Sequence, residues 1–231
     1  MTTPTNEVQP SPSLCQAVAA EGLGTALLLA IVVGSGIMAQ QLSQGNIAVA
    51  LLANTLSTGA GLFVLIQVFA PLSGAHFNPA VSLVQALDGK LAWRIALLYI
   101  VAQGLGGVLG VWLAHGMFDL PILQASSKVR SSTGQWLAEG VATFGLVFLI
   151  LRVQHLALSV VAGCVALYIT SAYWFTASTS FANPAVTLAR SFTDTFAGIR
   201  LGDAPAFIVA QMVGAGLAIG CARFFATRTT V

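Results

Sequence analysis

Long apolar segments separated by short polar turns make up most of this chain. Six of these segments are long enough to cross a lipid bilayer as α-helices, which takes about 20 residues. They cover residues 14–38, 47–70, 91–115, 134–151, 156–174 and 205–225. Because the segments are apolar on all sides rather than along one stripe, they predict helices that contact lipid and one another.

Two further apolar runs are too short to span a bilayer, and each begins with the same three residues. The first starts at Asn78-Pro79-Ala80 and ends at Leu87, and the second starts at Asn183-Pro184-Ala185 and ends near Asp194. Asn is a favoured N-cap and Pro a favoured first helical residue, so both runs predict short helices. About eleven helical residues cover only half the apolar core. Their non-helical approaches therefore predict a water-filled path, where irregular backbone is tolerated.

Three landmarks recur along the chain in the same order. Ala20-Glu21-Gly22 matches Ala138-Glu139-Gly140, Asn78-Pro79-Ala80-Val81 matches Asn183-Pro184-Ala185-Val186, and Ala102-Gln103-X-X-Gly106 matches Ala210-Gln211-X-X-Gly214, at offsets of 118, 105 and 108 residues. The first repeat covers residues 14–115 and the second 132–226. Each holds three spans, an odd number, so the second must enter the membrane from the opposite face. Inverted repeats of this kind place the functional site near the midplane, between the halves.

The inverted symmetry brings the two short helices together head to head. Both positive dipole ends then face the centre of the path, which repels cations and protons but not neutral solutes. The side-chain amides of Asn78 and Asn183 are candidates to donate hydrogen bonds to a passing oxygen from opposite sides.

Composition excludes several other classes of protein. The chain of 231 residues is 57% hydrophobic and 7% charged, against about 25% charged residues in soluble domains. A net charge of +2 offers no basic face for nucleic acid, and Cys15, Cys164 and Cys221 lack metal-ligand spacing. No nucleophile–base pair is present at usable spacing. We therefore expect one channel domain that is not an enzyme and has no metal or cofactor, preceded by a disordered tail at residues 1–13 rather than a signal peptide.

The segment Gly74-Ala75-His76-Phe77-Asn78-Pro79-Ala80-Val81, together with the second Asn-Pro-Ala, closely resembles the signature of the aquaporin, or major intrinsic protein, family. The resemblance covers nearly the whole chain. It implies an all-α membrane fold of six transmembrane helices plus two half-helices, one pore per subunit, homotetramers, and both termini in the cytoplasm, here at the inner membrane of a bacterium. Lys and Arg counts alone, five inside against four outside, barely favour this orientation.

The resemblance also implies roles for polar residues within the spans. Glu21 and Glu139 are expected to accept hydrogen bonds from the backbone that approaches each half-helix, with a proton relay as the alternative, because intramembrane carboxylates are usually paired or functional. His76 is expected in the pore wall on the cytoplasmic side. Gln103 and Gln211 are expected to make interhelical contacts, and His115 and His155 to lie at the interface. Close packing, inside the subunit or between subunits, is expected at Gly106-X-X-X-Gly110 and Gly216-X-X-X-Gly220.

The chain departs from the family at the outer selectivity filter. Family spacing from the two Asn residues assigns Thr58, Ser171, Ser180 and Val186 to this filter, where water channels typically have Phe, His, a small residue and Arg. A slip of one residue in the helix alignment would change the first two assignments. Arg190 lies seven residues past Asn183, and we expect it in the vestibule or an interface rather than in the narrow ring.

A filter without charge or aromatic rings predicts a wide pore, because diameter and lining donors set selectivity. We expect passage of glycerol, arsenous and antimonous acid, water, and bulkier methylated acids. The pattern resembles a bacterial aquaporin subgroup associated with arsenic resistance, which also has Val in place of the Arg. The alternatives are a water-selective pore in which Arg190 or a loop residue fills the gap, and a coupled transporter that uses the two Glu residues.

Overall fold

The computed structural model describes residues 12–226, and its six long helices agree with the six predicted spans. The predicted tail at residues 1–13 lies outside the described residues, apart from its last two. The long helices are α1 (Leu14–Leu42), α2 (Ile47–Ser73), α4 (Trp93–Met117), α5 (Thr133–Val153), α6 (Leu158–Phe175) and α8 (Ala204–Phe224). Each is long and apolar enough to cross a bilayer. The fold is therefore the all-α membrane fold that the sequence predicts.

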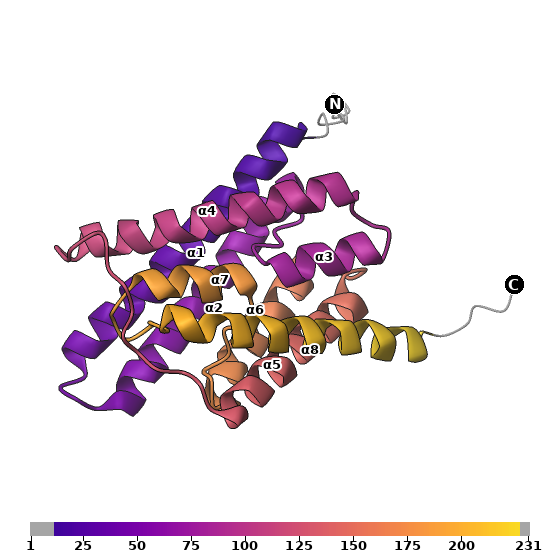
Figure 1. Cartoon of the computed structure of the whole chain (residues 1–231). Coiled ribbons are helices and arrows are strands. Elements are labelled where there is room, and N and C mark those ends of the chain that lie inside the picture. The colour runs from indigo at the N-terminus through magenta and orange to yellow at the C-terminus, as the bar shows by residue number, and fades with distance from the viewer. Residues whose placement is uncertain (1–11, 227–231) are drawn as a thin grey trace, which may run out of the picture.

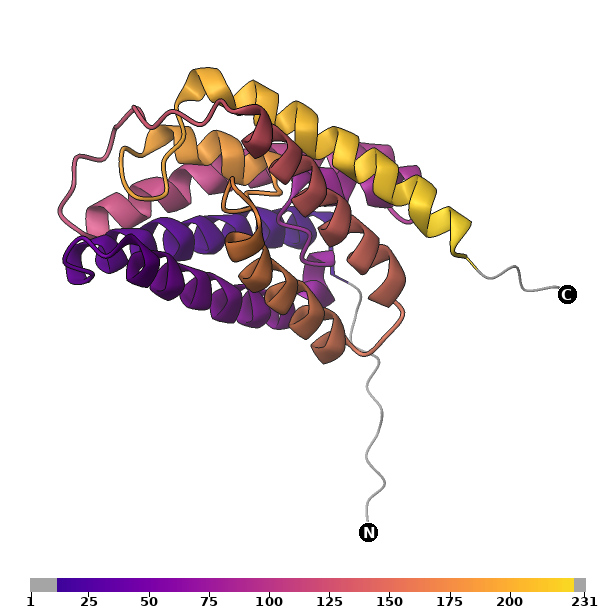
Figure 2. The same cartoon turned by 90° about the horizontal axis from the view of Figure 1, so that it is seen from below.

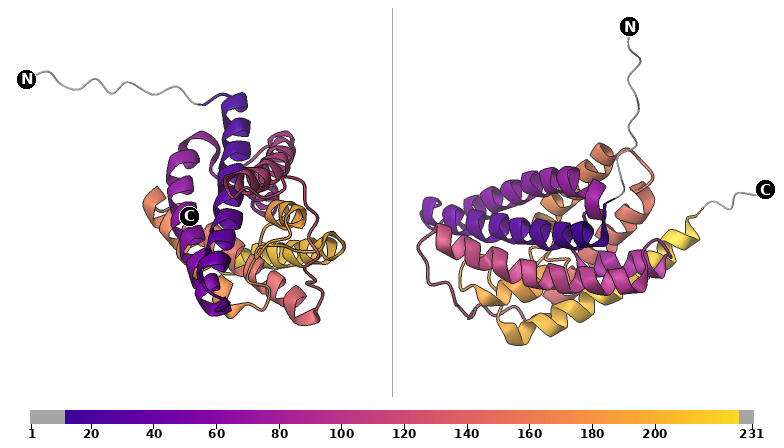
Figure 3. Two further views of the ribbon diagram at one scale, coloured as in Figure 1. Left: turned by 90° about the vertical axis from the view of Figure 1, so that its left-hand side faces the viewer. Right: turned by 90° about the horizontal axis from the view of Figure 1, so that it is seen from above.

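The two short helices also begin where the sequence predicts, but they differ in length. They are α3 (Pro79–Leu87) and α7 (Pro184–Ala189), and α7 continues as the 3₁₀ turn η1 (Arg190–Phe192). A second 3₁₀ turn, η2 (Leu201–Asp203), leads into α8. Both short helices pack against α4 and α8, and α7 lies between these two long helices in Figures 2 and 3.

Helix pairs at equivalent places in the two repeats pack in the same way. Helix α1 packs on α4, and α5 packs on α8. A Cβ atom on Gly106 would lie 2.1 Å from the carbonyl oxygen of Gly22, and one on Gly214 would lie 2.2 Å from that of Gly140. Only glycine fits at these two crossings. The duplicated sequence is thus also a duplicated packing arrangement.

The two predicted glycine packing motifs differ within the subunit, where only the first packs closely. Gly110 packs as expected, since a Cβ there would lie 2.1 Å from the carbonyl oxygen of Ala26. Gly216 and Gly220, by contrast, are exposed, and an added Cβ would have nothing within 4 Å. The reason is helical phase: Gly214, not Gly216, occupies the α8 position that faces the neighbouring helix.

The described ends of the chain, the start of α1 and the end of α8, lie at the same end of the bundle, together with the turn after α3 (Figure 1). An even number of spans requires this arrangement. The 118–132 segment, which joins the two repeats, runs across the opposite end of the bundle in the same view.

Candidate functional site: a cavity between the two half-helices

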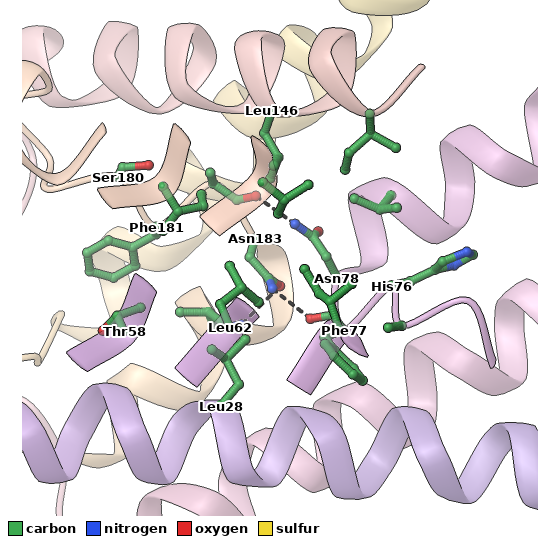
Figure 4. A pocket seen from close by; sticks show the side chains of 18 of the residues that line it. Leu28, Thr58, Leu62, His76, Phe77, Asn78, Leu146, Ser180, Phe181 and Asn183 are labelled. Carbon is green, nitrogen blue, oxygen red and sulfur yellow. Dashed lines mark hydrogen bonds between the residues drawn. The ribbon is translucent and has the colours of Figure 1, made fainter. Parts of the chain in front are cut away.

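A cavity of about 110 Å³ lies where the two repeats meet. Helices α1, α2, α5 and α6 supply most of its apolar side chains. The non-helical approaches to α3 and α7 supply most of the rest, together with Val81 of α3, Val186 of α7 and Arg190 of η1. Figure 4 shows it extending from Thr58 and Phe181, past Asn78 and Asn183, to His76. We call its two ends the Phe181 end and the His76 end.

The two Asn side chains join the half-helices at the middle of the cavity. Asn78 Nδ2 donates to the carbonyl oxygen of Ala182 at 2.8 Å, and Asn183 Nδ2 donates to that of Phe77 at 2.7 Å (Figure 4). Each Asn Oδ1 also accepts from the backbone N–H two residues further on, at 2.9 Å. Because an amide has two N–H groups, one per side chain is used in this exchange and one remains.

The backbone before each half-helix has left-handed torsion angles at residues other than glycine. Ala75 and Phe77 have φ values of 51° and 49°, and Ser180 and Ala182 have 48° and 49°. Such residues cost free energy and persist only where the surroundings hold them. In this chain, two buried carboxylates contact these segments.

Glu21 holds the approach to α3. Its carboxylate accepts the backbone N–H groups of His76 at 2.9 Å and Phe77 at 2.7 Å, the Ser73 hydroxyl at 2.6 Å, and the Gln103 amide at 2.8 Å. The side chain is fully buried and does not line the cavity. Its hydrogen bonds compensate for burying a charge, which is otherwise very costly.

Glu139 holds the approach to α7 in the same way. It accepts the backbone N–H groups of Phe181 at 2.8 Å and Ala182 at 2.9 Å, and the Gln211 amide at 2.6 Å. It is also fully buried and outside the cavity wall. Gln211 extends the network to α7 through Thr187 at 2.8 Å. The two carboxylates are therefore equivalent parts of one duplicated scaffold.

Three of the four residues assigned to the filter line the Phe181 end of the cavity, and the fourth does not. Thr58, Ser180 and Val186 are buried in its wall. Ser171 is exposed, and its hydroxyl donates to the carbonyl oxygen of Tyr168 within α6. Tyr173 lines the cavity instead, and its hydroxyl donates to Thr58 Oγ1 at 3.4 Å.

The phase of α6 explains this correction. The cavity-lining residues of α6 recur every fourth position, at Val161, Val165, Ile169 and Tyr173. Ser171 is two residues from Tyr173, a rotation of about 200° around the helix, so it faces away. This four-residue stripe is visible in the sequence and was the signal that spacing from Asn183 alone missed.

Phe181 and Arg190 line the cavity together with Tyr173, so its wall contains aromatic rings and a charge that the four assigned residues lack. Arg190 is 3% exposed, and its guanidinium carbon lies 3.4 Å from the centre of the Phe181 ring. Its Nε donates to the carbonyl oxygen of Ala197. A regular helix continued from Asn183 would carry Arg190 towards the vestibule or an interface, but α7 ends at Ala189 and the chain turns into the 3₁₀ helix η1.

The connection between the repeats adds a second cation at the Phe181 end. Arg130, in the 118–132 segment, is 9% exposed and donates to the carbonyl oxygens of Ser178 at 3.0 Å and Gly198 at 2.9 Å. Its guanidinium carbon lies 5.1 Å from the centre of the Phe181 ring. The sequence analysis did not assign Arg130 to the site. Because the chain is so apolar and has so few cations, each one is a candidate for a functional residue.

Lys128 lies outside the spans, near the same two arginines. Partial burial, together with repulsion from Arg130 and Arg190, lowers the pKa of Lys128 to about 8. Its ammonium donates to the carbonyl oxygen of Phe196 at 2.8 Å. The Phe181 end is thus the more positive end of the cavity.

The three histidines lie in the cavity wall, in the buried last turn of α4 and in the exposed turn after α5. His76 lines the cavity, and its Nδ1 lies 3.0 Å from Ser82 Oγ. His115 is fully buried rather than interfacial, because its two ring nitrogens contact the Ile122 carbonyl oxygen at 2.9 Å and Thr193 Oγ1 at 2.8 Å. His155 is exposed in the turn after α5, as expected.

The sequence of this chain is similar to a known protein family and to individual proteins in it. Residues 8–169 match the family model for the major intrinsic proteins. The chain belongs to this family. It is 58% identical over 205 residues to the aquaglyceroporin AqpS of Rhizobium meliloti (strain 1021), which covers 89% of this chain and 88% of the relative. Aquaporin TIP1-2 of Zea mays is 35% identical over 142 residues, covering 59% of this chain and 56% of the relative.

A solved structure extends the likeness to the fold. The aquaglyceroporin from Plasmodium falciparum superimposes with a TM-score of 0.71 at 24% identity, over 94% of this chain and 98% of the other. The chain is therefore a multi-pass membrane protein and a passive channel for small neutral solutes, and it is not an enzyme.

Proposed function

We propose that this channel conducts glycerol and similar small polyols, water, and the neutral hydroxides arsenous and antimonous acid. The observation that carries the proposal is Val186. It lines the cavity beside the second Asn-Pro-Ala, at the position where the family signature usually has Arg. A smaller, uncharged side chain leaves more room there, and pore diameter and lining donors set selectivity.

The chemistry of the cavity wall suits such solutes. Aliphatic side chains lie on both sides of the two Asn amides, Leu28 and Leu62 on one side and Leu146 on the other (Figure 4). A polyol or a trihydroxide presents hydroxyl groups that hydrogen-bond to the amides, while its remaining surface contacts the aliphatic side chains. The 58% identity to a protein named aquaglyceroporin supports passage of glycerol.

We assign one barrier to cations to the middle of the cavity. The N-termini of α3 and α7 begin at Pro79 and Pro184 and meet through the Asn78 and Asn183 hydrogen bonds. Their positive dipole ends disfavour cations at this point. In this proposal Glu21 and Glu139 are structural, since neither lines the cavity. That position also argues against coupled transport and a proton relay.

A water-selective pore is the second candidate, and the Phe181 end favours it. Tyr173, Phe181 and Arg190 supply the aromatic rings and the charge that spacing from the Asn residues did not predict. Two bulky rings and a long cationic side chain in the wall narrow the passage, which counts against the room that Val186 leaves. Methylated arsenicals, which the sequence also led us to expect, are bulkier than the solutes proposed above, so these rings would exclude them first.

We further propose that the chain is a homotetramer in the cytoplasmic membrane of a bacterium. The bacterial relative at 58% identity supports this membrane. In the proposed orientation the His76 end, the start of α1 and the end of α8 face the cytoplasm.

The test is stopped-flow light scattering of proteoliposomes under gradients of water, glycerol and arsenous acid. Wild-type protein is compared with Val186→Arg, and Val186→Leu controls for added size without charge. We expect wild type to pass all three solutes and Val186→Arg to keep water but lose most glycerol and arsenous acid flux. A wild type that passes water alone would instead support the water-selective candidate.

A further inference from the structure

We propose that Arg190 is the charged selectivity residue of this pore, in place of the arginine that the family signature has directly after the second Asn-Pro-Ala. In this role it offers an N–H donor to the solute and a fixed positive charge to exclude cations. The proposal rests on the proposed channel function and deepens it, because it names a residue that determines specificity at the Phe181 end.

The first observation is the way in which the guanidinium is held. Its Nε donates to the carbonyl oxygen of Ala197, and its plane is placed over the Phe181 ring at 3.4 Å. A cation close to an aromatic face is stabilised by the ring quadrupole, and more strongly when desolvated. These two contacts orient the group without using all of its donors.

The second observation is an unused donor. Arg190 Nη1 is buried and has no hydrogen-bond partner within residues 12–226, although Arg190 lines the cavity. The hydroxyl of Ser180, which lines the same cavity, is likewise buried without a partner. A buried polar group without a partner costs free energy. A solute oxygen or a water at the Phe181 end would satisfy both groups, which is what a filter requires.

The third observation is that no carboxylate forms an ion pair with Arg190 within residues 12–226. The ion pairs in the described part of the chain are Lys90–Asp88, at 2.6 Å, and Arg200–Asp203, at 2.7 Å. Neither includes Arg190, so no directly paired carboxylate cancels its charge, and Arg130 adds a second positive charge near the Phe181 ring. A monovalent cation that enters the Phe181 end is repelled by both charges.

The position of Arg190 places the positive charge at a different residue from the one that sets the width of the passage. Residues 186 and 190 are four residues, about one helical turn, apart. Moving the cation to residue 190 leaves the space beside Val186 open, while the long side chain still reaches the cavity wall. This arrangement allows a wider passage for neutral solutes without loss of the positive charge.

The test moves the charge between the two positions. Proteoliposomes with an internal pH-sensitive dye report proton leak under a potassium–valinomycin potential, and glycerol swelling reports the neutral path. We compare wild type, Arg190→Val and the double variant Val186→Arg/Arg190→Val. Arg200→Gln is the control, because it removes a cation near the same end that does not line the cavity.

We expect Arg190→Val to raise the rate of proton leak about tenfold or more. The variant removes the electrostatic repulsion between the guanidinium and a cation that passes close to it. The double variant should bring proton leak back to the wild-type rate, and Arg200→Gln should leak no more than wild type. An Arg190→Val variant whose proton leak equals that of wild type would overturn the proposal. So would a double variant that leaks as much as the single one, because the leak would then come from lost packing on Phe181.

If Arg190→Val does not fold, Arg190→Gln and Arg190→Lys replace it. Leak in the Gln variant but not in the Lys variant supports the proposal, and equal tightness overturns it. The proposed solute range is tested separately. A wild-type protein that passes water but not glycerol would contradict that range, and proton leak through the Arg190 variants would still test the role of Arg190.

Discussion

The two half-helices begin with the same residues but end differently, and this difference separates scaffold from selectivity. Helix α3 is a regular helix of 9 residues, and the cavity near its approach ends at His76. Helix α7 has 6 residues and tightens into a 3₁₀ turn at Arg190. The duplicated parts, Asn, Pro and Glu, hold the backbone in both halves. The parts that are not duplicated give each end of the cavity its own chemistry.

The largest expected effects come from breaking the scaffold that the two halves share. Glu139→Gln places an amide N–H₂ among backbone N–H donors that now point at a carboxylate. We expect the free energy of unfolding to fall by about 2–4 kcal/mol, because buried donors lose their acceptor. Glu21→Gln should cause a similar loss. Denaturant titration in detergent measures both, with the exposed Asp88→Asn as control. A clear difference between the two would mean that the halves are not equivalent scaffolds.

Helix crossings provide the next test of this equivalence. Gly214→Ala adds a methyl group 2.2 Å from a backbone oxygen of α5, and Gly106→Ala does the same at α1. The helices must separate, and we expect each change to cost about 1–3 kcal/mol. Gly216→Ala, where an added Cβ has open space, is the matched control. Thermal unfolding in detergent would rank the three variants, and an equal loss for Gly216→Ala would contradict the packing described here.

The Phe181 end should respond in selectivity rather than in stability. Tyr173→Ala removes a ring from the cavity wall and the hydroxyl that contacts Thr58. We expect glycerol flux to rise by about threefold or more relative to water flux, because a wider ring relaxes size selection. Ser171→Ala, on the exposed face of α6, should leave the ratio unchanged. The reverse result would restore Ser171 to the filter and remove Tyr173 from it.

The smallest expected effect is electrostatic. The pKa of Lys128 is about 8 in the folded chain, below the ordinary value of 10.5. Between these values the unfolded chain binds more protons than the folded one, so stability should rise with pH from about 8 upward. Below pH 8 Lys128 is protonated in both states, so the full destabilisation from burying its charge is present. Unfolding midpoints of wild type and Lys128→Gln, measured from pH 7 to 10, test this, and the variant should lack the rise. A parallel pH response in both proteins would mean that another group is responsible.

Some of this protein could be predicted from the order of its residues alone. The six spans, the two Asn-Pro-Ala helix starts and the duplicated Glu residues depend on hydrophobic runs, capping chemistry and internal repetition. These are local or periodic properties of a sequence. The family resemblance added to this reading the topology and the expectation of a channel.

Tertiary structure decided which side chains meet at the Phe181 end. Tyr173 replaced Ser171 because the phase of α6 determines which face meets the cavity. Arg190 reached the cavity because α7 ends early and a long side chain can fold back. Arg130 came from a segment between the repeats, whose path depends on the contacts it makes with residues 178 and 198. Helix phase, helix ends and loop paths are set by packing between distant segments, which spacing along the chain does not contain.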